Sequence, residues 1–348
     1  MIKVLIVDDS ALIRKVLTEI LTSDPEIDVV GSAADPYIAR DKIKSLNPDV
    51  LTLDIEMPKM DGIKFLKNLM RLRPMPVVMI STLTQKGAPS TLQALELGAV
   101  DYVGKPSADN PEQLAEYAEE ILSKIHGAAI ANVGRLEQQA SRALAHKNVA
   151  KRTGLDAKDW IIAIGASTGG TEALRELLSD MPVDCPPIVV TQHIPPVFSA
   201  SFAKRLDGIL PQTVHEASDG DKIMPGHVYI APGSYQLEVI LKRGAYYCHV
   251  FDGDRVNLHK PSVEVLFNSI TEQCAKRTIG IMLTGMGADG AKAMLRMKHA
   301  GSYNIIQDES SSVVWGMPGE VYRLGGAHEV LPLKHIAEHI TQHLRNLA

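Results

Sequence analysis

Short apolar runs alternate with amphipathic stretches along most of the chain. Apolar runs predict strands in the first third of the chain at 4–7, 29–30, 50–53, 77–80 and 101–103. Apolar residues spaced three and four apart predict a helix over 11–21, and the last helix of this region is predicted at about 111–124. Alternating strands and helices are typical of a parallel sheet covered on both faces. We therefore predict a doubly wound α/β domain with right-handed crossovers.

The same alternation resumes at Trp160 and continues to the end of the chain. Core strands are predicted at 160–164, 187–193, 278–284 and 303–308. Runs at 227–230, 237–241 and 246–251 predict a β-rich insert. Helices are predicted at 171–178, 263–275, 290–300, 319–324 and 332–344. The second domain is therefore predicted to be a Rossmann-like, doubly wound parallel sheet with a β-rich insert.

The stretch between the two patterns has few large apolar residues and an excess of positive charge. Its basic residues are Lys124, Arg135, Arg142, Lys147, Lys151, Arg152 and Lys158, and its acids are Glu137 and Asp156. We interpret it as a partly helical, solvated linker, with a partner-binding segment as the alternative. The predicted organisation is a first domain over 1–122, a linker over 123–157 and a second domain over 158–348.

Composition excludes several classes of protein. The chain has 348 residues, of which 45% are hydrophobic and 22% charged, as in ordinary globular proteins of two domains. The formal net charge of −5 predicts no nucleic-acid partner. No apolar run approaches the roughly 20 residues of a membrane span, and the N-terminus does not resemble a signal peptide. We therefore expect a cytoplasmic monomer without membrane insertion. Cys185, Cys248 and Cys274 form no C-x-x-C pair, so we expect buried thiols rather than disulfides or zinc.

Charged and hydroxyl side chains follow the predicted strands of the first domain. Asp8 and Asp9 follow the first strand, Asp54 the third, Ser81 the fourth and Lys105 the fifth. Because ligands of open parallel sheets bind at the carboxyl ends of the strands, we expect these side chains to meet. Three carboxylates in one place favour a cation such as Mg²⁺. Lysine and serine opposite them suit a phosphoryl group on Asp54.

This set resembles the receiver domain of two-component response regulators. The matching motifs are Val7-Asp8-Asp9-Ser10, Asp54 with Met57-Pro58 and Asp61-Gly62, Ser81-Thr82, and Tyr102 with Lys105-Pro106. The resemblance implies that a histidine kinase phosphorylates Asp54. It also implies Mg²⁺ bound by Asp8, Asp9, Asp54 and the Glu56 carbonyl, and a switch through Ser81, Tyr102 and Lys105. In such domains the Lys105–Pro106 bond is cis.

A serine stands in a glycine-rich turn at the start of the second domain. The apolar run at 160–164 ends at Gly165-Ala166-Ser167-Thr168-Gly169-Gly170, and an amphipathic stretch follows at once. Glycines permit a sharp strand-to-helix turn and keep bulk away from the hydroxyl. The N–H groups at the start of the helix would face an oxyanion. Such turns also hold phosphates, so a phosphate-binding loop is the alternative.

A nucleophilic serine needs a base and a group that orients the base. His193 ends the next strand, which places it at the same sheet edge as Ser167. The acid is either Asp289, on a glycine-rich turn, or Asp308, after the following strand. The backbone at 285–287 could supply an oxyanion N–H. The order Ser, His, Asp differs from that of α/β-hydrolases, so we expect a convergent triad on a different sheet.

The second domain closely resembles the catalytic domain of chemotaxis protein-glutamate methylesterases. The motifs that carry the resemblance are 165–170, Gln192-His193-Ile194-Pro195-Pro196, Ala231-Pro232-Gly233, Lys260-Pro261-Ser262-Val263 and 283–290. The resemblance implies Ser167 as nucleophile, His193 as base, Asp289 as orienting acid and the Met286 N–H as oxyanion donor, with no cofactor in this domain. Gln236 and Lys292-Ala293 depart from the family pattern, outside the triad.

The resemblance also implies a function. Such enzymes hydrolyse glutamyl methyl esters on the signalling helices of chemoreceptors, release methanol and deamidate receptor glutamines. The resemblance also implies that the unphosphorylated receiver covers the active site. A nucleotide-binding protein is a weaker interpretation, because G-x-G-x-x-G spacing is absent and His193 stands where a ribose-binding acid is expected. A transcriptional regulator is weaker still, because there is no basic helix-turn-helix pattern. A relative that serves a non-chemotactic receptor array remains open.

Overall fold

The chain divides into two structural units, 1–146 and 147–348. The computed structural model describes residues 1–57, 60–82, 87–105, 111–134 and 159–347. Most of the expected linker lies outside these ranges, so the limits 1–122, 123–157 and 158–348 remain a prediction. None of the helices in the described ranges combines the length and apolar character that a bilayer-spanning segment requires.

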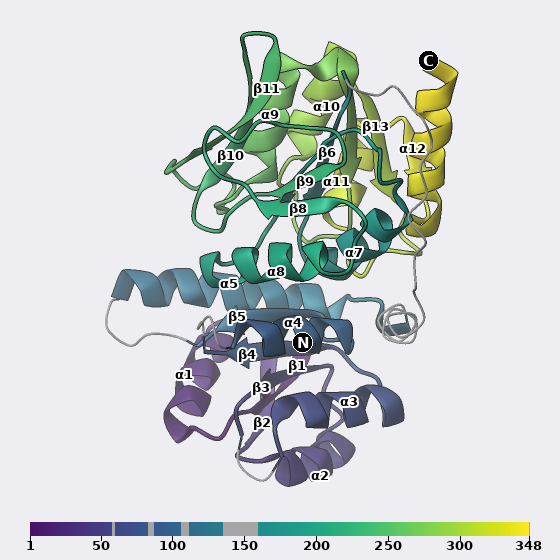
Figure 1. The fold of residues 1–348 in the computed structure, drawn as a ribbon. Coiled ribbons are helices and arrows are strands. Elements are labelled where there is room, and N and C mark those ends of the chain that lie inside the picture. The colour runs from purple at the N-terminus through teal and green to yellow at the C-terminus, as the bar shows by residue number, and fades with distance from the viewer. Residues whose placement is uncertain (58–59, 83–86, 106–110, 135–158, 348) are drawn as a thin grey trace. The chain divides into compact units, whose positions relative to one another are not determined.

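The first unit is a five-stranded parallel sheet with helices on both faces, as predicted (Figure 1). The strand order is β2-β1-β3-β4-β5. The strands are β1 (Ile2–Val7), β2 (Ile27–Ala33), β3 (Val50–Asp54), β4 (Val77–Ser81) and β5 (Asp101–Gly104). The helices are α1 (Ala11–Thr22), α2 (Pro36–Leu46), α3 (Gly62–Leu72), α4 (Ala88–Glu96) and α5 (Pro111–Ala129). Helices α1 and α5 contact each other, as do α3 and α4.

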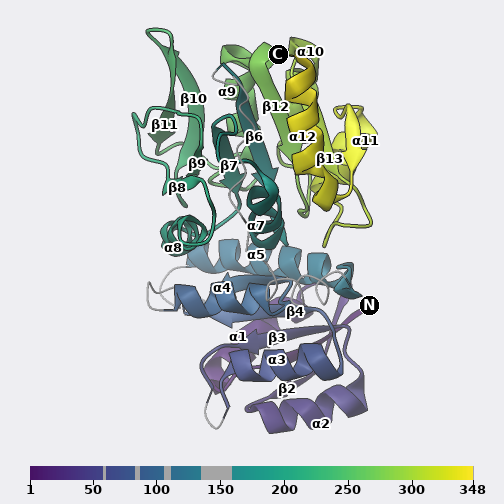
Figure 2. The same ribbon diagram turned by 45° about the vertical axis from the view of Figure 1, so that its right-hand side comes forward.

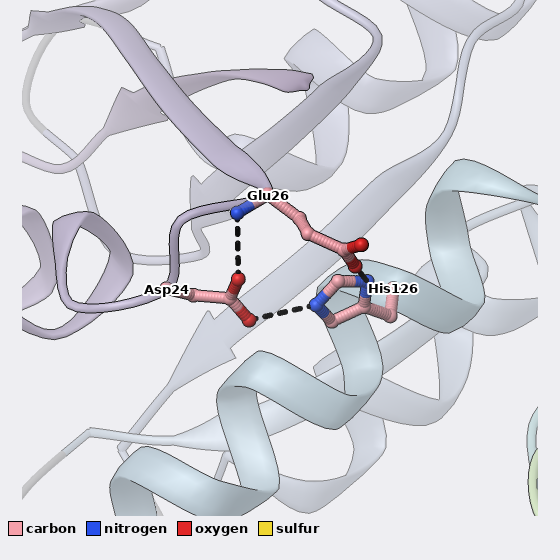
Figure 3. Close-up of side chains that lie close together, drawn as sticks. All are labelled: Asp24, Glu26 and His126. Atoms are coloured by element: carbon pink, nitrogen blue, oxygen red, sulfur yellow. Dashed lines mark hydrogen bonds and ion pairs between the residues drawn. The ribbon is translucent and has the colours of Figure 1, made fainter.

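Helix α5 ends at Ala129, beyond the predicted end near residue 124. Ile121, Ile125 and Ala128 are fully buried at helical spacing, so packing against the first unit extends the helix. Figure 3 shows His126 of α5 beside Asp24, with Nε2 2.8 Å from Oδ2 of Asp24. The start of the predicted linker is therefore a docked part of the first unit.

The second unit is built on a seven-stranded parallel sheet. The strand order is β14-β13-β12-β6-β7-β9-β8. In chain order these strands are β6 (Ile161–Ala166), β7 (Ile188–Gln192), β8 (Thr213–Glu216), β9 (His227–Ile230), β12 (Thr278–Met282), β13 (Tyr303–Gln307) and β14 (Glu329–Leu331). This arrangement confirms the predicted doubly wound class.

Helices cover both faces of this sheet. They are α7 (Gly170–Asp180), α8 (Pro196–Asp207), α9 (Val263–Gln273), α10 (Ala291–Ala300), α11 (Met317–Leu324) and α12 (Leu333–Leu347). Helix α7 contacts α12, whereas α10 contacts both α9 and α11 (Figure 2). The core between α9, α10 and the sheet includes Phe267, Met282 and Met294.

The β-rich insert is smaller than predicted. Strands β10 (Gln236–Lys242) and β11 (Ala245–Phe251) form an antiparallel hairpin of their own. The run at 227–230 was expected in this insert, but it is β9 and pairs in parallel with β7 in the main sheet. Strands β8 and β14 were not predicted, because they are short and carry polar residues. These two strands join the sheet because they pair with β9 and β13, and their own residue pattern does not mark them as strands.

Candidate active site

Three loops of the second unit meet where the strand order reverses. Strand β6 lies between β7 and β12, and the chain leaves β6 first toward β7 and later returns to β12. Ser167 follows β6, His193 follows β7 and Asp289 lies between β12 and α10. The carboxyl edge at such a switch point is the usual ligand site of open α/β sheets. The fold therefore brings the three candidate residues to one edge of the sheet.

The turn that carries Ser167 is fixed by backbone bonds and by close approaches at glycine. The Ser167 N–H donates to the Thr284 carbonyl at 3.1 Å, and the Gly170 N–H donates to the Ser167 carbonyl at 2.7 Å. Gly169 has a φ of +76°. A Cβ at Gly170 would lie 2.1 Å from Oε1 of Gln192. The glycines therefore permit a left-handed residue and tight packing beside the serine.

Ser167, His193 and Asp289 form a hydrogen-bonded series. Nδ1 of His193 lies 3.0 Å from Oγ of Ser167, and Nε2 lies 2.8 Å from Oδ2 of Asp289. When Nε2 carries its proton toward the carboxylate, Nδ1 presents a lone pair to the serine hydroxyl. This is the geometry of an activated nucleophile with an oriented base.

Asp289 is buried and surrounded by donors. Asn257 Nδ2 and Ser262 Oγ donate to Oδ1 at 2.8 and 2.7 Å, and the Val263 N–H donates to Oδ2 at 2.7 Å. Burial by itself raises the pKa of Asp289. The hydrogen bond and charge of His193, with the bonds from Asn257 and Ser262, lower that pKa from 3.8 to about 2. Asp289 is therefore a carboxylate at neutral pH.

The alternative acid, Asp308, lies in a different environment. Its side chain binds the turn that follows β13, through Ser310 and Ser311. Binding its own turn in this way is a structural role that an acid after a strand commonly has, and it differs from a catalytic role. Of the two acids proposed from the sequence, Asp289 is the one that the structure places against His193.

Two neighbours of the candidate triad were not found from the sequence. The ring of His259 stacks on that of His193, with centroids 3.6 Å apart and planes 17° apart. Asn257 belongs to the same segment and binds Asp289. Neither carries a pattern that marks it, because this segment lies outside the regular strands and helices. The family motif at 260–263 follows this segment directly, and it was the feature of the sequence that could have drawn attention to these two residues.

The loop after β12 lies directly against the serine. A Cβ at Gly285 would lie 2.9 Å from Cβ of Ser167 and 2.4 Å from Sδ of Met317. Gly285 is held by a 3.0 Å bond from its N–H to the Val314 carbonyl. Met286 follows it and is half-buried. The expected oxyanion role of the Met286 N–H stays a prediction.

The first unit holds an acidic site at its own switch point, between β1 and β3. Asp8, Asp9 and Asp54 offer oxygen atoms that all lie within 4.8 Å of one another. Nζ of Lys105 lies 2.8 Å from Asp54 Oδ2 and 3.3 Å from Asp8 Oδ2. A Cβ at Gly62 would lie 2.0 Å from the Asp54 carbonyl oxygen, so this glycine lets α3 begin beside the acid.

Lys105 neutralises only part of the negative charge of the buried carboxylates Asp8 and Asp54. Burial is the largest influence on Asp54, and with repulsion from Asp8 it raises the pKa of Asp54 to about 6, although Lys105 acts in the opposite direction. Burial likewise raises the pKa of Asp8, against the attraction of Lys105. Oxygen-only ligands in a partly open site are the donor set of a hard divalent cation. The residues present therefore fit such a cation.

The remaining predicted receiver residues surround this site. Ser81 is buried and accepts a 3.1 Å hydrogen bond from Thr91 Oγ1. Tyr102 is buried on β5, and Nζ of Lys124 lies 5.0 Å from the centre of its ring. Glu56 is exposed, and its N–H donates to Asp54 Oδ1 at 3.2 Å. The expected Lys105–Pro106 cis bond and Pro58 lie outside the described residues.

A second group of possible metal ligands, Asp24, Glu26 and His126, also occurs in the described ranges. Asp24 accepts from the Glu26 N–H at 2.8 Å and faces His126, so it serves the docking of α5 (Figure 3). The hydrogen bond from His126 is the main influence that lowers the pKa of Asp24. This cluster is accounted for by packing.

The two units together define a receiver domain joined to an α/β domain with the geometry of a serine hydrolase. Comparison with known protein families identifies the same two domains. The response regulator receiver domain matches residues 4–119, and the CheB methylesterase family matches residues 162–340. The chain belongs to the CheB methylesterase family.

Relatives match over nearly their whole length. A protein-glutamate methylesterase/protein-glutamine glutaminase 2 of Saccharophagus degradans is 56% identical over 98% of both chains. One from Nitrosomonas europaea is 52% identical over 99% of this chain and 96% of its own. The crystal structure of the Thermotoga maritima CheB methylesterase catalytic domain covers 53% of this chain and 97% of its own, at 39% identity and a TM-score of 0.52.

Proposed function

We propose that this protein is a phosphorylation-activated enzyme of chemotaxis that hydrolyses glutamate methyl esters on chemoreceptors and deamidates receptor glutamines. The observation that carries the proposal is His193 between Ser167 and Asp289, with separations of 3.0 and 2.8 Å. The printed names of relatives that match almost the whole chain support the substrate class.

In the proposed acylation step, Nδ1 of His193 takes the Ser167 proton while Oγ attacks the glutamyl carbonyl carbon. A C–O bond forms and the carbonyl oxygen becomes an oxyanion. The bond to the methoxy oxygen then breaks, and His193 returns the proton so that methanol leaves. Deamidation follows the same steps with ammonia as the leaving group.

In deacylation, His193 takes a proton from water while the water oxygen attacks the acyl-serine. The ester bond to Ser167 breaks, the proton returns to Oγ and the receptor leaves with a glutamate side-chain carboxylate. We assign the oxyanion to the Met286 N–H, whose neighbour Gly285 approaches Ser167 closely. The start of α7 at Gly170, three residues after Ser167, adds a favourable dipole.

Control by phosphorylation is assigned to the acidic site of the first unit. We propose that Asp54 accepts a phosphoryl group from a histidine kinase. Asp8, Asp9, Asp54 and the Glu56 carbonyl would hold Mg²⁺, which supplies charge neutralisation for phosphoryl transfer. Lys105 pairs with a phosphoryl oxygen and Ser81 donates to another. Ser81, Tyr102 and Lys105 then relay the change.

The proposed switch needs little energy. Phosphorylation adds about −1.5 to −2 charges at Asp54. A tenfold activation corresponds to about 1.4 kcal/mol of bias between restrained and active states. We propose that the unphosphorylated receiver restrains access to Ser167 and that phosphorylation releases it.

Methanol release from a methylated receptor fragment, with and without a small phosphodonor, tests both parts. Ser167→Ala should release no methanol, and wild-type release by this variant would refute the nucleophile. Asp54→Ala should keep the basal rate and ignore the phosphodonor. Strong activation of Asp54→Ala would refute the proposed control.

A further inference from the structure

We infer that Leu258 is a substrate-contacting residue that helps the active site to select esters carried on a protein helix. The inference rests on the proposed function, because it names a determinant of substrate choice for the same reaction. It is carried by the turn at 256–259, which is both strained and anchored to the candidate triad.

The segment from Val256 to His259 is a tight two-residue turn. The N–H groups of Val256 and His259 each donate to the other residue's carbonyl at 3.0 Å. The central residues, Asn257 and Leu258, have φ values of 52° and 69°. Positive φ at both positions is typical of a type I′ turn, which favours glycine, asparagine and aspartate. Leucine at the second position is therefore under backbone strain.

Both neighbours of Leu258 contact the triad. On one side, Nδ2 of Asn257 donates to Asp289 at 2.8 Å. On the other, the His259 ring stacks on His193 at 3.6 Å between centroids. These two anchors fix the backbone of Leu258 beside the orienting acid and the base. A group bound at this turn is therefore held close to the reacting serine.

Leu258 is also among the most exposed large apolar residues of the described chain, with 72% of its surface accessible. A single exposed leucine is ordinary. An exposed leucine in a left-handed position is unfavourable for two reasons, backbone strain and exposed apolar surface. Asparagine or glycine at this position would relieve the strain and remove the apolar surface. Strain that the fold tolerates at a site is a sign of function. Contact with an apolar surface during catalysis accounts for both features.

The occupant that fits is the substrate itself. The proposed ester is carried on a protein helix, and helices that pack against other helices present apolar residues one turn from their polar ones. An apolar side chain near the methylated glutamate can cover Leu258 while the ester reaches Ser167. A small free ester has no such side chain, so Leu258 should matter for the protein substrate alone.

The test compares two substrates, a methylated helical receptor fragment and N-acetylglutamate γ-methyl ester, in full-length protein. Leu258→Asn removes the apolar side chain and suits the left-handed backbone. Leu258→Met keeps an apolar side chain. Leu241→Asn is the matched control, because Leu241 is 47% exposed and lies at the far end of β10. Methanol release gives kcat and KM, and thermal unfolding gives Tm.

For Leu258→Asn we expect the KM for the receptor fragment to rise roughly fivefold or more, with kcat/KM for the small ester unchanged and Tm equal or higher. Leu258→Met should retain most of the affinity, and Leu241→Asn should change neither substrate. Equal losses on both substrates, or no loss on the fragment, would overturn the inference. If the wild type hydrolyses neither ester, the proposed function fails first and this inference fails with it.

Discussion

The backbone N–H of Val263 lies 2.7 Å from Oδ2 of Asp289, the same oxygen that faces Nε2 of His193. Val263 is the first residue of α9, so the start of that helix binds the candidate orienting acid. A helix N-terminus stabilises negative charge. The carboxylate of Asp289 is thus fixed by an element that is distant from it in sequence.

Replacing Asp289 should abolish most of the activity without unfolding the domain. In Asp289→Asn the amide cannot stabilise a protonated His193, and we expect kcat for methanol release to fall about 10³- to 10⁴-fold. Asp308→Asn is the control, because the Asp308 side chain binds its own turn. A larger loss in Asp308→Asn than in Asp289→Asn would reverse the assignment of the acid.

Asp54 should make the first unit less stable as pH rises. Its pKa is 3.8 unfolded and about 6 folded, so the folded state binds the extra proton between these values. The stability of the folded state therefore falls as pH rises from about 4 to 6 and stays reduced at pH 7. Asp54→Asn removes this penalty and should stabilise the unit by roughly 1–3 kcal/mol at pH 7.

Amide hydrogen exchange of β1 and β3 in the full chain measures this difference. The gain in protection for Asp54→Asn should be large at pH 7 and disappear near pH 4, after correction for the intrinsic pH dependence of exchange. A gain that is independent of pH, or a loss at pH 7, would contradict the assigned cause.

Mg²⁺ should stabilise the first unit through the same acids. Binding at 100 times the dissociation constant adds about 2.7 kcal/mol to the folded state. We expect the same exchange measurement to show added protection with Mg²⁺ in the wild type and much less in Asp9→Asn. Asp24→Asn should respond like the wild type. A lost response in Asp24→Asn alone would place the metal at the His126 cluster.

A single methyl group should disturb the serine site. In Gly285→Ala the new Cβ would meet Ser167 Cβ at 2.9 Å and Met317 Sδ at 2.4 Å. Both the serine and the adjoining loop must shift, so we expect at least a tenfold loss of kcat, because small misplacements of reacting groups are costly. Gly208→Ala is the control, since its Cβ would meet nothing closer than 3.6 Å. Equal activity in the two variants would show that the loop adapts.

Local patterns in the sequence were sufficient for the fold class and for the candidate residues. The buried runs of β1, β3 and β6 are apolar throughout or nearly so, and each ends at a polar residue or a glycine turn that the fold requires. Because parallel strands share one carboxyl edge, the order of these runs also predicted that Ser167 and His193 would meet. Glycine spacing around Ser167 marked the turn for the same reason.

Other features were decided by contacts between distant segments. The apolar run at 227–230 fits a strand of the insert and a strand of the main sheet equally well. Its parallel pairing with β7 places it in the main sheet as β9. The position of Asp289 against His193 depends on the start of α9, and the extension of α5 depends on burial of Ile125 and Ala128. The sequence by itself thus determined which residues are candidates for the chemistry, because residue type and period are local. The tertiary structure alone decided that Asn257 binds Asp289 and that His259 stacks on His193, because these contacts arise from distances across the fold.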